Sequence, residues 1–249
     1  MNLDEVGSGR LYGDLAWLMP LISPPSDYEE EAAHWRTVLR EKLGAGRHEI
    51  LELGAGGGFN LSHLTSDYDA TVVDLSDAML ELCRKLNPGV KTHQGDMRTV
   101  RLGRTYDAVL IHDAISYMLD EADLLAAFTT AAAHLDPGGI FVVSPDHFKE
   151  TLHIPDLVHE IHDFGDRRVT YVEYTFDPDP ADTQVEALMT YLIEEDGTVQ
   201  IEHDRHTWGL FPKATWIRLM EEAGFSVESH EFPLTGLDRP YVLLVGTKR

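Results

Sequence analysis

Three glycines with a spacing of two, Gly54, Gly56 and Gly58, follow a short apolar segment at 49–53 and precede Phe59. A strand that runs into such a turn and then a helix lets a ligand approach the backbone, because glycine has no side chain and adopts positive φ angles. A dinucleotide site of the usual kind needs another glycine at position 59, where this chain has phenylalanine. The spacing therefore favours a nucleoside with a short tail over a pyrophosphate.

Acidic residues follow the next two predicted strands, 70–73 and 91–94. Asp74 lies about twenty residues beyond the glycines, where an acidic side chain accepts the ribose hydroxyls of an adenine nucleoside. Asp96 can accept a hydrogen bond from the exocyclic amine of adenine, and Met97 can pack on the ring. Three loops at the carboxyl ends of adjacent strands are thus expected to converge on one nucleoside.

The fourth predicted strand, 106–111, is followed by a polar segment that contains His112, Asp113 and Tyr117. Imidazole and carboxylate groups are common general bases, so one hypothesis is that His112 or Asp113 orients a nucleophile or removes its proton. The alternative is that Asp113 caps the turn and that His112 contributes only its backbone.

Further polar and aromatic side chains, His203, His206 and Trp208, lie on one β-rich segment at 198–208. We expect them to form a wall of a substrate site, because they alternate with other residues along a strand. The alternative is the solvated edge of a sheet.

A group of histidines and acidic residues precedes that segment. Imidazole and carboxylate groups can bind a divalent metal ion, but the spacing here matches no established catalytic zinc motif. We therefore expect an acidic surface cluster and no metal site. The residues concerned are His153, Asp156, His159, Glu160, His162 and Asp163.

The elements that position these residues follow from the hydrophobic pattern. Short apolar runs alternate with helical segments, which predicts a parallel sheet with helices on both faces. Ser76 is expected to cap the helix that contains Met79, and Asp120 to begin another. The predicted strands of this sheet are 49–53, 70–73, 91–94, 106–111 and 139–143.

The pattern changes after Ser144, where three β-rich runs at 169–176, 185–193 and 198–208 follow one another without helices and predict an inserted antiparallel sheet. A helix at 213–223, ended by Gly224, and two final strands at 225–232 and 241–247 complete the chain. The expected domains are a helical cap at 1–45, a nucleoside-binding domain at 46–145 and 209–249, and a lid at 146–208.

Composition narrows the partners. The 249 residues carry a formal net charge of -23, so the surface should repel DNA and RNA. Cys83 is the only cysteine, which excludes an intrachain disulfide. The sequence shows neither a leader pattern nor an apolar stretch of membrane-spanning length, so we expect a cytoplasmic protein with a small-molecule substrate and no membrane partner. The oligomeric state stays open, with a homodimer as one candidate.

These motifs resemble the class I S-adenosylmethionine-dependent methyltransferases. Glu52-Leu53-Gly54-Ala55-Gly56-Gly57-Gly58 is similar to their first motif, Asp74 to the second, Asp96-Met97 to the third, and the run after Val109 to the fourth. The resemblance extends over roughly 12–249.

A narrower resemblance is to the amino-sugar N,N-dimethyltransferases of macrolide biosynthesis. It is carried by His93-Gln94-Gly95-Asp96-Met97-Arg98, by Arg101-Leu102-Gly103-Arg104 and by Leu135-Asp136-Pro137-Gly138-Gly139. The chain departs from those enzymes at His112-Asp113, where they are less charged, and across most of the lid. The departure concerns the substrate and not the cofactor.

The resemblance implies an α/β fold with a Rossmann-like seven-stranded, mostly parallel sheet whose last strand is antiparallel, helices on both faces, and an inserted antiparallel β lid. It implies S-adenosylmethionine as the cofactor and S-adenosylhomocysteine as its product. Tyr117, His203, His206 and Trp208 are expected to face the substrate, and Tyr12 has the alternative of packing only. The expected cofactor residues are Tyr12, Tyr28, Glu52, Gly54, Ala55, Gly56, Asn60, Asp74, Leu75, Met79, Asp96, Met97, Arg98, Ile111 and His112.

The expected reaction is methyl transfer to an amine or hydroxyl of a small polar metabolite such as an amino sugar. Orientation can supply effective molarities of ~10⁵ to 10⁸ M, whereas a general base adds ~10² to 10⁴-fold, so a base is helpful and not obligatory. A noncatalytic S-adenosylmethionine-binding or sensor protein is the alternative. A nicotinamide oxidoreductase is disfavoured by Phe59 and by the terminal pair of strands.

Overall fold

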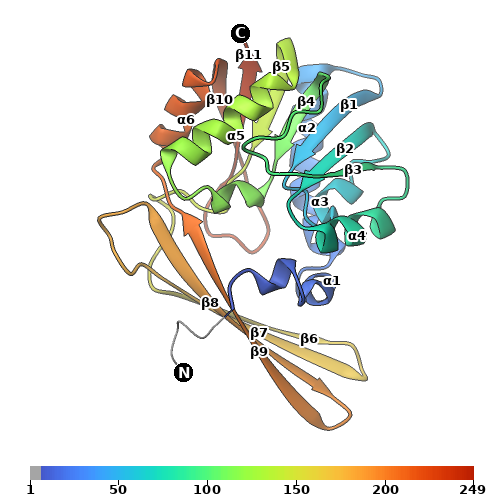
Figure 1. Ribbon diagram of the computed structural model, residues 1–249, viewed down its shortest axis with the longest axis vertical. Helices are drawn as coiled ribbons and strands as arrows, with labels where there is room; N and C mark the ends of the chain where they lie inside the picture. The colour runs from blue at the N-terminus through green and yellow to red at the C-terminus, as the bar shows by residue number, and fades with distance from the viewer. Residues whose placement is uncertain (1–6) are drawn as a thin grey trace.

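The chain forms two β-sheets, which a computed structural model describes over residues 7–249 (Figure 1). Residues 1–6 of the expected N-terminal cap lie outside the described residues. The larger sheet has seven strands in the order β10-β11-β5-β4-β1-β2-β3. Its strands are β1 (His48–Leu53), β2 (Tyr68–Asp74), β3 (Lys91–Gln94), β4 (Tyr106–Ile111), β5 (Leu135–Val143), β10 (Phe225–Phe232) and β11 (Tyr241–Lys248).

Helices cover both faces of the larger sheet. The helices α5 (Glu121–Ala133) and α6 (Lys213–Glu222) pack on one face, and α2 (Glu29–Leu43) with α4 (Asp77–Leu86) packs on the other. The central strand β4 is therefore buried on both sides, and its sequence is apolar except for the exposed Asp107. The predicted Rossmann-like parallel sheet with helices on both faces is confirmed.

The last strand, β11, runs antiparallel to both of its neighbours, β5 and β10, as predicted. One boundary differs from the sequence prediction. The strand β5 begins at Leu135 and not at position 139, so Pro137 and Gly138 lie within it. The register between β4 and β5 is irregular there, which accommodates a proline and a glycine with φ of +89°.

Two helices begin at the predicted caps. The Ser76 hydroxyl accepts a hydrogen bond from the Met79 N–H at 3.1 Å, and the Asp120 carboxylate accepts one from the Asp123 N–H at 2.8 Å. Short helical turns α3 (Phe59–Ser62) and η5 (Asp113–Tyr117) follow β1 and β4. Within residues 7–249, every helix is too short or too polar to cross a membrane.

The second sheet is the inserted antiparallel sheet that the sequence predicted, with one more strand than expected. Its strands are β6 (Asp156–Asp163), β7 (Arg167–Phe176), β8 (Gln184–Glu195) and β9 (Thr198–Gly209). The extra strand β6 was missed because nearly all of its residues are exposed, and an exposed edge strand needs no apolar alternation. In β8, by contrast, buried and part-buried residues alternate.

The N-terminal segment joins this second sheet to the larger one. It contains η2 (Arg10–Tyr12), η3 (Ala16–Leu18), α1 (Met19–Ile22) and η4 (Pro25–Tyr28). Leu11, Leu18 and Ile22 form an apolar cluster with Val169 and Tyr191 of the second sheet. Burial of such side chains contributes about 1.5–3 kcal/mol each, so this cluster fixes the lid over the sheet edge. The exact domain boundaries at 45, 145 and 208 stay a prediction.

Candidate functional site

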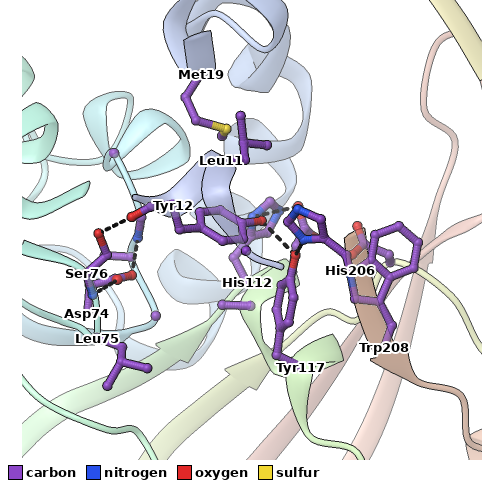
Figure 2. Close-up of a pocket in the computed structure, with 18 of the residues that line it drawn as sticks. Leu11, Tyr12, Met19, Asp74, Leu75, Ser76, His112, Tyr117, His206 and Trp208 are labelled. Carbon is purple, nitrogen blue, oxygen red and sulfur yellow. Dashed lines mark hydrogen bonds and ion pairs between the residues drawn. The ribbon is translucent and has the colours of Figure 1, made fainter. Parts of the chain in front are cut away.

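A cavity of about 1050 Å³ lies between the carboxyl ends of the parallel strands, the N-terminal segment and the second sheet (Figure 2). Single-ligand pockets usually measure about 300–1,000 Å³, so this one has room for two small molecules. The glycine loop after β1 lines one side of it, and β7 to β9 line the other. The cavity is therefore the place where the predicted nucleoside and a second reactant would meet.

The glycine loop is held open toward the cavity. Gly54 has φ of +73°, and a Cβ atom on it would lie 2.5 Å from the Ala114 Cβ and 2.6 Å from the Met97 Cε. Gly56 has φ of +53°, and a Cβ there would meet nothing within 4 Å. The loop is thus tightly packed at Gly54 and open at Gly56, which leaves backbone accessible to a ligand.

Asp74, at the end of β2, is fixed by the same loop. One carboxylate oxygen accepts a hydrogen bond from the Gly56 N–H at 2.7 Å, and the other accepts one from the Ser76 N–H at 2.8 Å. Burial raises the pKa of Asp74, although these two backbone bonds oppose the shift. Each oxygen keeps a lone pair for a further donor, so the geometry fits the pair of hydroxyls that the sequence predicted.

Asp96, after β3, is held by an arginine. The Arg98 guanidinium contacts Asp96 at 2.6 Å and Asp123 at 2.8 Å. Its hydrogen bonds lower the pKa of Asp96, which is therefore ionised at neutral pH. Arg98 acts here as a clamp that aims the Asp96 carboxylate at the cavity and leaves it able to accept a bond from an amine.

Among residues 7–249, two oxygen atoms in the cavity wall are buried without a hydrogen-bond partner, the Oε2 of Glu52 and the Oδ1 of Asn60. Burial raises the pKa of Glu52 to about 7. A buried acceptor without a donor costs about 1–3 kcal/mol, and such a cost is accepted at binding sites. These two oxygens indicate a ligand with donor groups, such as an ammonium group.

His112, the residue after β4, is fully engaged with two acidic side chains. Its Nε2 lies 2.7 Å from Glu31 and its Nδ1 lies 3.2 Å from Asp113. Burial alone would lower the pKa of His112, but Asp113 and Glu31 outweigh burial and raise that pKa to about 10. An imidazolium with both nitrogens occupied accepts no proton, so this geometry favours a positioning role for His112 over a role as base.

Asp113 forms a close acidic pair with Asp146, which follows β5. Burial and the neighbouring Asp146 raise the pKa of Asp113 well above its ordinary value. Burial likewise raises the pKa of Asp146 to about 6, against the effect of His112. Both residues line the cavity, so the pair presents negative charge to any cationic group that enters. The side chain of His112, the N-cap residue of η5, makes no capping hydrogen bond.

Four aromatic or imidazole side chains meet at the second reactant's side of the cavity (Figure 2). The Tyr117 hydroxyl lies 3.0 Å from the Tyr12 hydroxyl and 2.5 Å from the His206 Nδ1. The Tyr12 and Tyr117 rings meet edge to face with their centroids 5.6 Å apart, and the ring centroids of Trp208 and His206 are 6.4 Å apart. They come from η2, η5 and β9, which the fold brings together.

The structure brings most of the predicted site residues to this cavity. Three of them do not line it. Ile111 is completely buried in β4, and Met79 is completely buried in α4. His203 lies on the opposite face of β9 from His206, because side chains of a strand alternate, and its Nδ1 lies 3.0 Å from the Thr190 hydroxyl. The predicted residues that do line the cavity are Tyr12, Tyr28, Glu52, Gly54, Ala55, Gly56, Asn60, Asp74, Leu75, Asp96, Met97, Arg98, His112, Asp113, Tyr117, His206 and Trp208.

The sequence analysis missed other residues of the cavity wall, among them Leu11, Met19, Asp146, Glu160 and Glu173. Asp146 follows a parallel strand directly, and that signal could have identified it. Glu160 belongs to the histidine-rich cluster that we interpreted as an acidic surface. Leu11, Met19 and Glu173 carry no local signal, because tertiary packing alone brings them to the cavity. Among residues 7–249, no group of three or more His, Cys, Asp or Glu side chains is arranged to hold a metal ion.

Comparisons with known proteins agree with this geometry. The family model described as Methyltransferase domain matches residues 50–139. The chain is 32% identical over 204 residues to the dTDP-3-amino-3,4,6-trideoxy-alpha-D-glucopyranose N,N-dimethyltransferase of Streptomyces venezuelae, which covers 81% of this chain and 85% of that enzyme.

Solved structures of other proteins have a similar fold. Streptomyces venezuelae DesVI superposes with a TM-score of 0.80 at 30% identity, covering 95% of this chain and 96% of that one. CalS10 of Micromonospora echinaspora, an amino pentose methyltransferase solved with S-adenosylmethionine bound, has a TM-score of 0.78 at 27% identity, covering 89% and 92%.

The raised pKa of Glu52 generates a prediction about stability. Since that pKa rises from 4.5 in the unfolded chain to about 7 in the native protein, the native state binds the extra proton between these values. The free energy of unfolding therefore falls as the pH rises through this window. Without ligand, Glu52→Gln should gain roughly 1–3 kcal/mol over the unaltered chain at pH 8, and less than half of that at pH 5, measured by urea unfolding.

The matched control is Glu49→Gln, an exposed position on the same strand. Its effect on the free energy of unfolding should be small and equal at both pH values. A Glu52→Gln variant that loses stability equally at pH 5 and pH 8 would contradict the assignment of a penalised buried carboxylate.

Proposed function

The chain belongs to the S-adenosylmethionine-dependent methyltransferases, and from this premise we propose that it methylates the amino group of an amino sugar. The family relationship rests on 32% identity over 81% of the chain with a sugar N,N-dimethyltransferase. The observation that carries the substrate proposal is the acidic pair Asp113–Asp146, which shares one cavity with the glycine loop. A carboxylate pair beside the donor side attracts and orients an amine.

The residues of the glycine loop side fit S-adenosylmethionine. When bound, this cofactor supplies an electrophilic methyl group on a positively charged sulfur. We assign the ribose hydroxyls to Asp74, the adenine amine to Asp96 and the adenine ring to Met97. Glu52 and Asn60, whose buried oxygens lack donors, would hold the ammonium end.

The other side of the cavity is proposed to hold the acceptor. Asp113 and Asp146 would bind the amine as an ammonium group and release it as a neutral amine, because the raised pKa values allow one carboxyl of the pair to hold the proton. His112 and Glu31 fix the position of Asp113. Tyr117, His206 and Trp208 would line the sugar.

We also propose that the protein is a homodimer. The outer face of the second sheet, away from the cavity, exposes Leu157, Ile161, Tyr174, Val199 and Ile201, each at least 43% accessible. Four strands of this length offer roughly 600 Å² per copy, so two copies reach about 1,200 Å², the lower limit of a standard interface. A partner with the same strong negative charge approaches best where the surface is apolar.

The substrate proposal predicts the mass of the product. With S-adenosylmethionine, a nucleotide-linked amino sugar should gain one and then two methyl groups in mass spectrometry, while the analogue with a hydroxyl in place of the amine should gain none. Asp113→Asn should lower kcat/KM by about 10- to 100-fold, because an attracting carboxylate is lost. Asp107→Asn, exposed on the same strand β4, is the control and should keep full activity. Methylation of the hydroxyl analogue alone would overturn the proposal.

The packing around Gly54 predicts that a substitution there lowers cofactor affinity in addition to stability. Gly54→Ala places a Cβ against Ala114 and Met97, so the affinity for S-adenosylhomocysteine should fall at least about tenfold by calorimetry. Gly44→Ala, at the end of α2, has a similar positive φ and open space around it. Gly44→Ala should lose about 1–2 kcal/mol of stability because of its positive φ, and Gly54→Ala should lose about 1–3 kcal/mol more because of the clash, but only Gly54→Ala should lose affinity. Equal affinities for the two variants would contradict the proposed role of the loop.

The dimer proposal predicts a mass. Sedimentation equilibrium at micromolar concentration should give twice 27.9 kDa for the unaltered chain and 27.9 kDa for Ile161→Asp, since a buried aspartate would disrupt an apolar interface. Leu237→Asp, an exposed leucine elsewhere, should stay dimeric. A monomeric unaltered chain would refute this interface.

A further inference from the structure

Besides the acidic pair, a series of hydrogen-bonded polar groups lies at the cavity wall, and the reaction described so far does not use it. It begins at the Tyr117 hydroxyl, passes to the His206 Nδ1 at 2.5 Å, and continues from the His206 Nε2 to the Asp204 carboxylate at 2.8 Å. Asp204 and His206 are 0% and 1% exposed. A fully buried carboxylate and imidazole are expensive to retain, so this arrangement calls for a functional reason.

The fold fixes the positions of these hydrogen-bonded groups. Alternation along β9 directs Asp204, His206 and Trp208 to the same face, toward the N-terminal segment. The Asp204 Oδ2 also accepts a hydrogen bond from the Leu11 N–H at 2.7 Å. Burial tends to raise the pKa of Asp204, but hydrogen bonds from His206 and from the backbone lower it overall, so Asp204 is ionised. An ionised Asp204 keeps a proton on the His206 Nε2 and leaves the Nδ1 lone pair facing Tyr117.

We propose that His206, oriented by Asp204, receives the proton that the acceptor amine releases during methyl transfer, and that Tyr117 conducts this proton. The inference rests on the proposed function, because it needs an amine acceptor in the cavity. The amine N–H bond breaks as a new O–H bond forms on Tyr117, while the original Tyr117 proton passes to the His206 Nδ1. Tyr117 stays a neutral phenol, and the imidazolium is stabilised by Asp204.

The Tyr12 contact fits the loaded state of this relay. When His206 holds both protons, its Nδ1 donates to Tyr117, and the Tyr117 hydroxyl then donates to Tyr12 at 3.0 Å. Burial raises the pKa of Tyr117 well above its ordinary value, so a lasting phenolate is excluded and His206 is the end point. Between rounds the proton on the His206 Nδ1 returns through Tyr117 to water in the cavity. A second methylation of one nitrogen requires that the first product lose a proton, so the relay has a use in each round.

Several titratable and charged groups surround His206 and Asp204 and contribute to their field. They come from every element packed against the pair. They are Arg10, Tyr12 and Asp14 near η2, Asp113 and Tyr117 of η5, Asp146 after β5, Tyr171 and Glu173 of β7, Glu186 and Tyr191 of β8, and Glu202 of β9. His206→Gln leaves all of these surrounding groups in place, so its pH profile isolates the imidazole.

The test measures kcat against pH for the unaltered chain, His206→Gln and Tyr117→Phe, together with the affinity for S-adenosylhomocysteine. At neutral pH both variants should lose about 10² to 10⁴-fold in kcat, and their rates should recover as the pH rises, because solvent then deprotonates the amine. Cofactor affinity should stay within about twofold. His203→Gln, on the opposite face of β9, is the matched control and should keep the native profile.

Tyr117→Phe keeps the buried pair intact, so it tests the relay even where His206→Gln fails to fold. A native pH profile in both variants would overturn the relay, and a loss in His206→Gln with an unchanged Tyr117→Phe would overturn the conducting role. Absence of any product from the unaltered chain would instead refute the amine substrate, so the two failures are distinguishable.

Discussion

The site depends on one backbone contact between neighbouring strands. The N–H groups of Gly54 and Ala55 both donate to the carbonyl of Val73, at 2.7 and 3.2 Å, so the end of β1 is fixed against the end of β2. This contact brings the Gly56 N–H to the Asp74 carboxylate and leaves the loop open toward the cavity. A side chain at position 54 would clash with Ala114 and Met97, which explains why the loop requires glycine there.

Electrostatics divides the cavity into two halves with different tasks. On the cofactor side, the Arg98 guanidinium keeps Asp96 ionised, and the same clamp reaches Asp123. On the proposed acceptor side, burial raises the pKa values of Asp113 and Asp146, and the charge of Asp146 raises the pKa of Asp113 further. An ionised carboxylate suits a permanent hydrogen-bond acceptor, whereas a carboxyl pair with raised pKa values suits a group that exchanges protons. The neighbours of each carboxylate therefore determine whether it stays ionised or can exchange protons.

Sequence patterns predicted what depends on local order along the chain. The strands β2, β4 and β5 follow from apolar runs, and Ser76 and Asp120 follow from the chemistry of helix caps. The pattern of apolar residues did not reveal β6, because the residues of β6 are exposed. The sequence analysis also misplaced His203, which is three residues from His206 and therefore lies on the other face of β9. The contact of Tyr117 with His206 joins residues 89 positions apart, and only the packing of the second sheet on the N-terminal segment creates it.

Tyr12 connects the two halves of the cavity. Its backbone carbonyl accepts a hydrogen bond from the Ser76 hydroxyl, next to Asp74, while its ring contacts Tyr117 and His206 (Figure 2). The same N-terminal segment carries Leu11, whose N–H donates a hydrogen bond to Asp204, so one short stretch of chain contacts both the Asp74 side of the cavity and the buried pair. In the proposed function, this segment therefore helps to position the groups that bind the two reactants, although no sequence motif marks it.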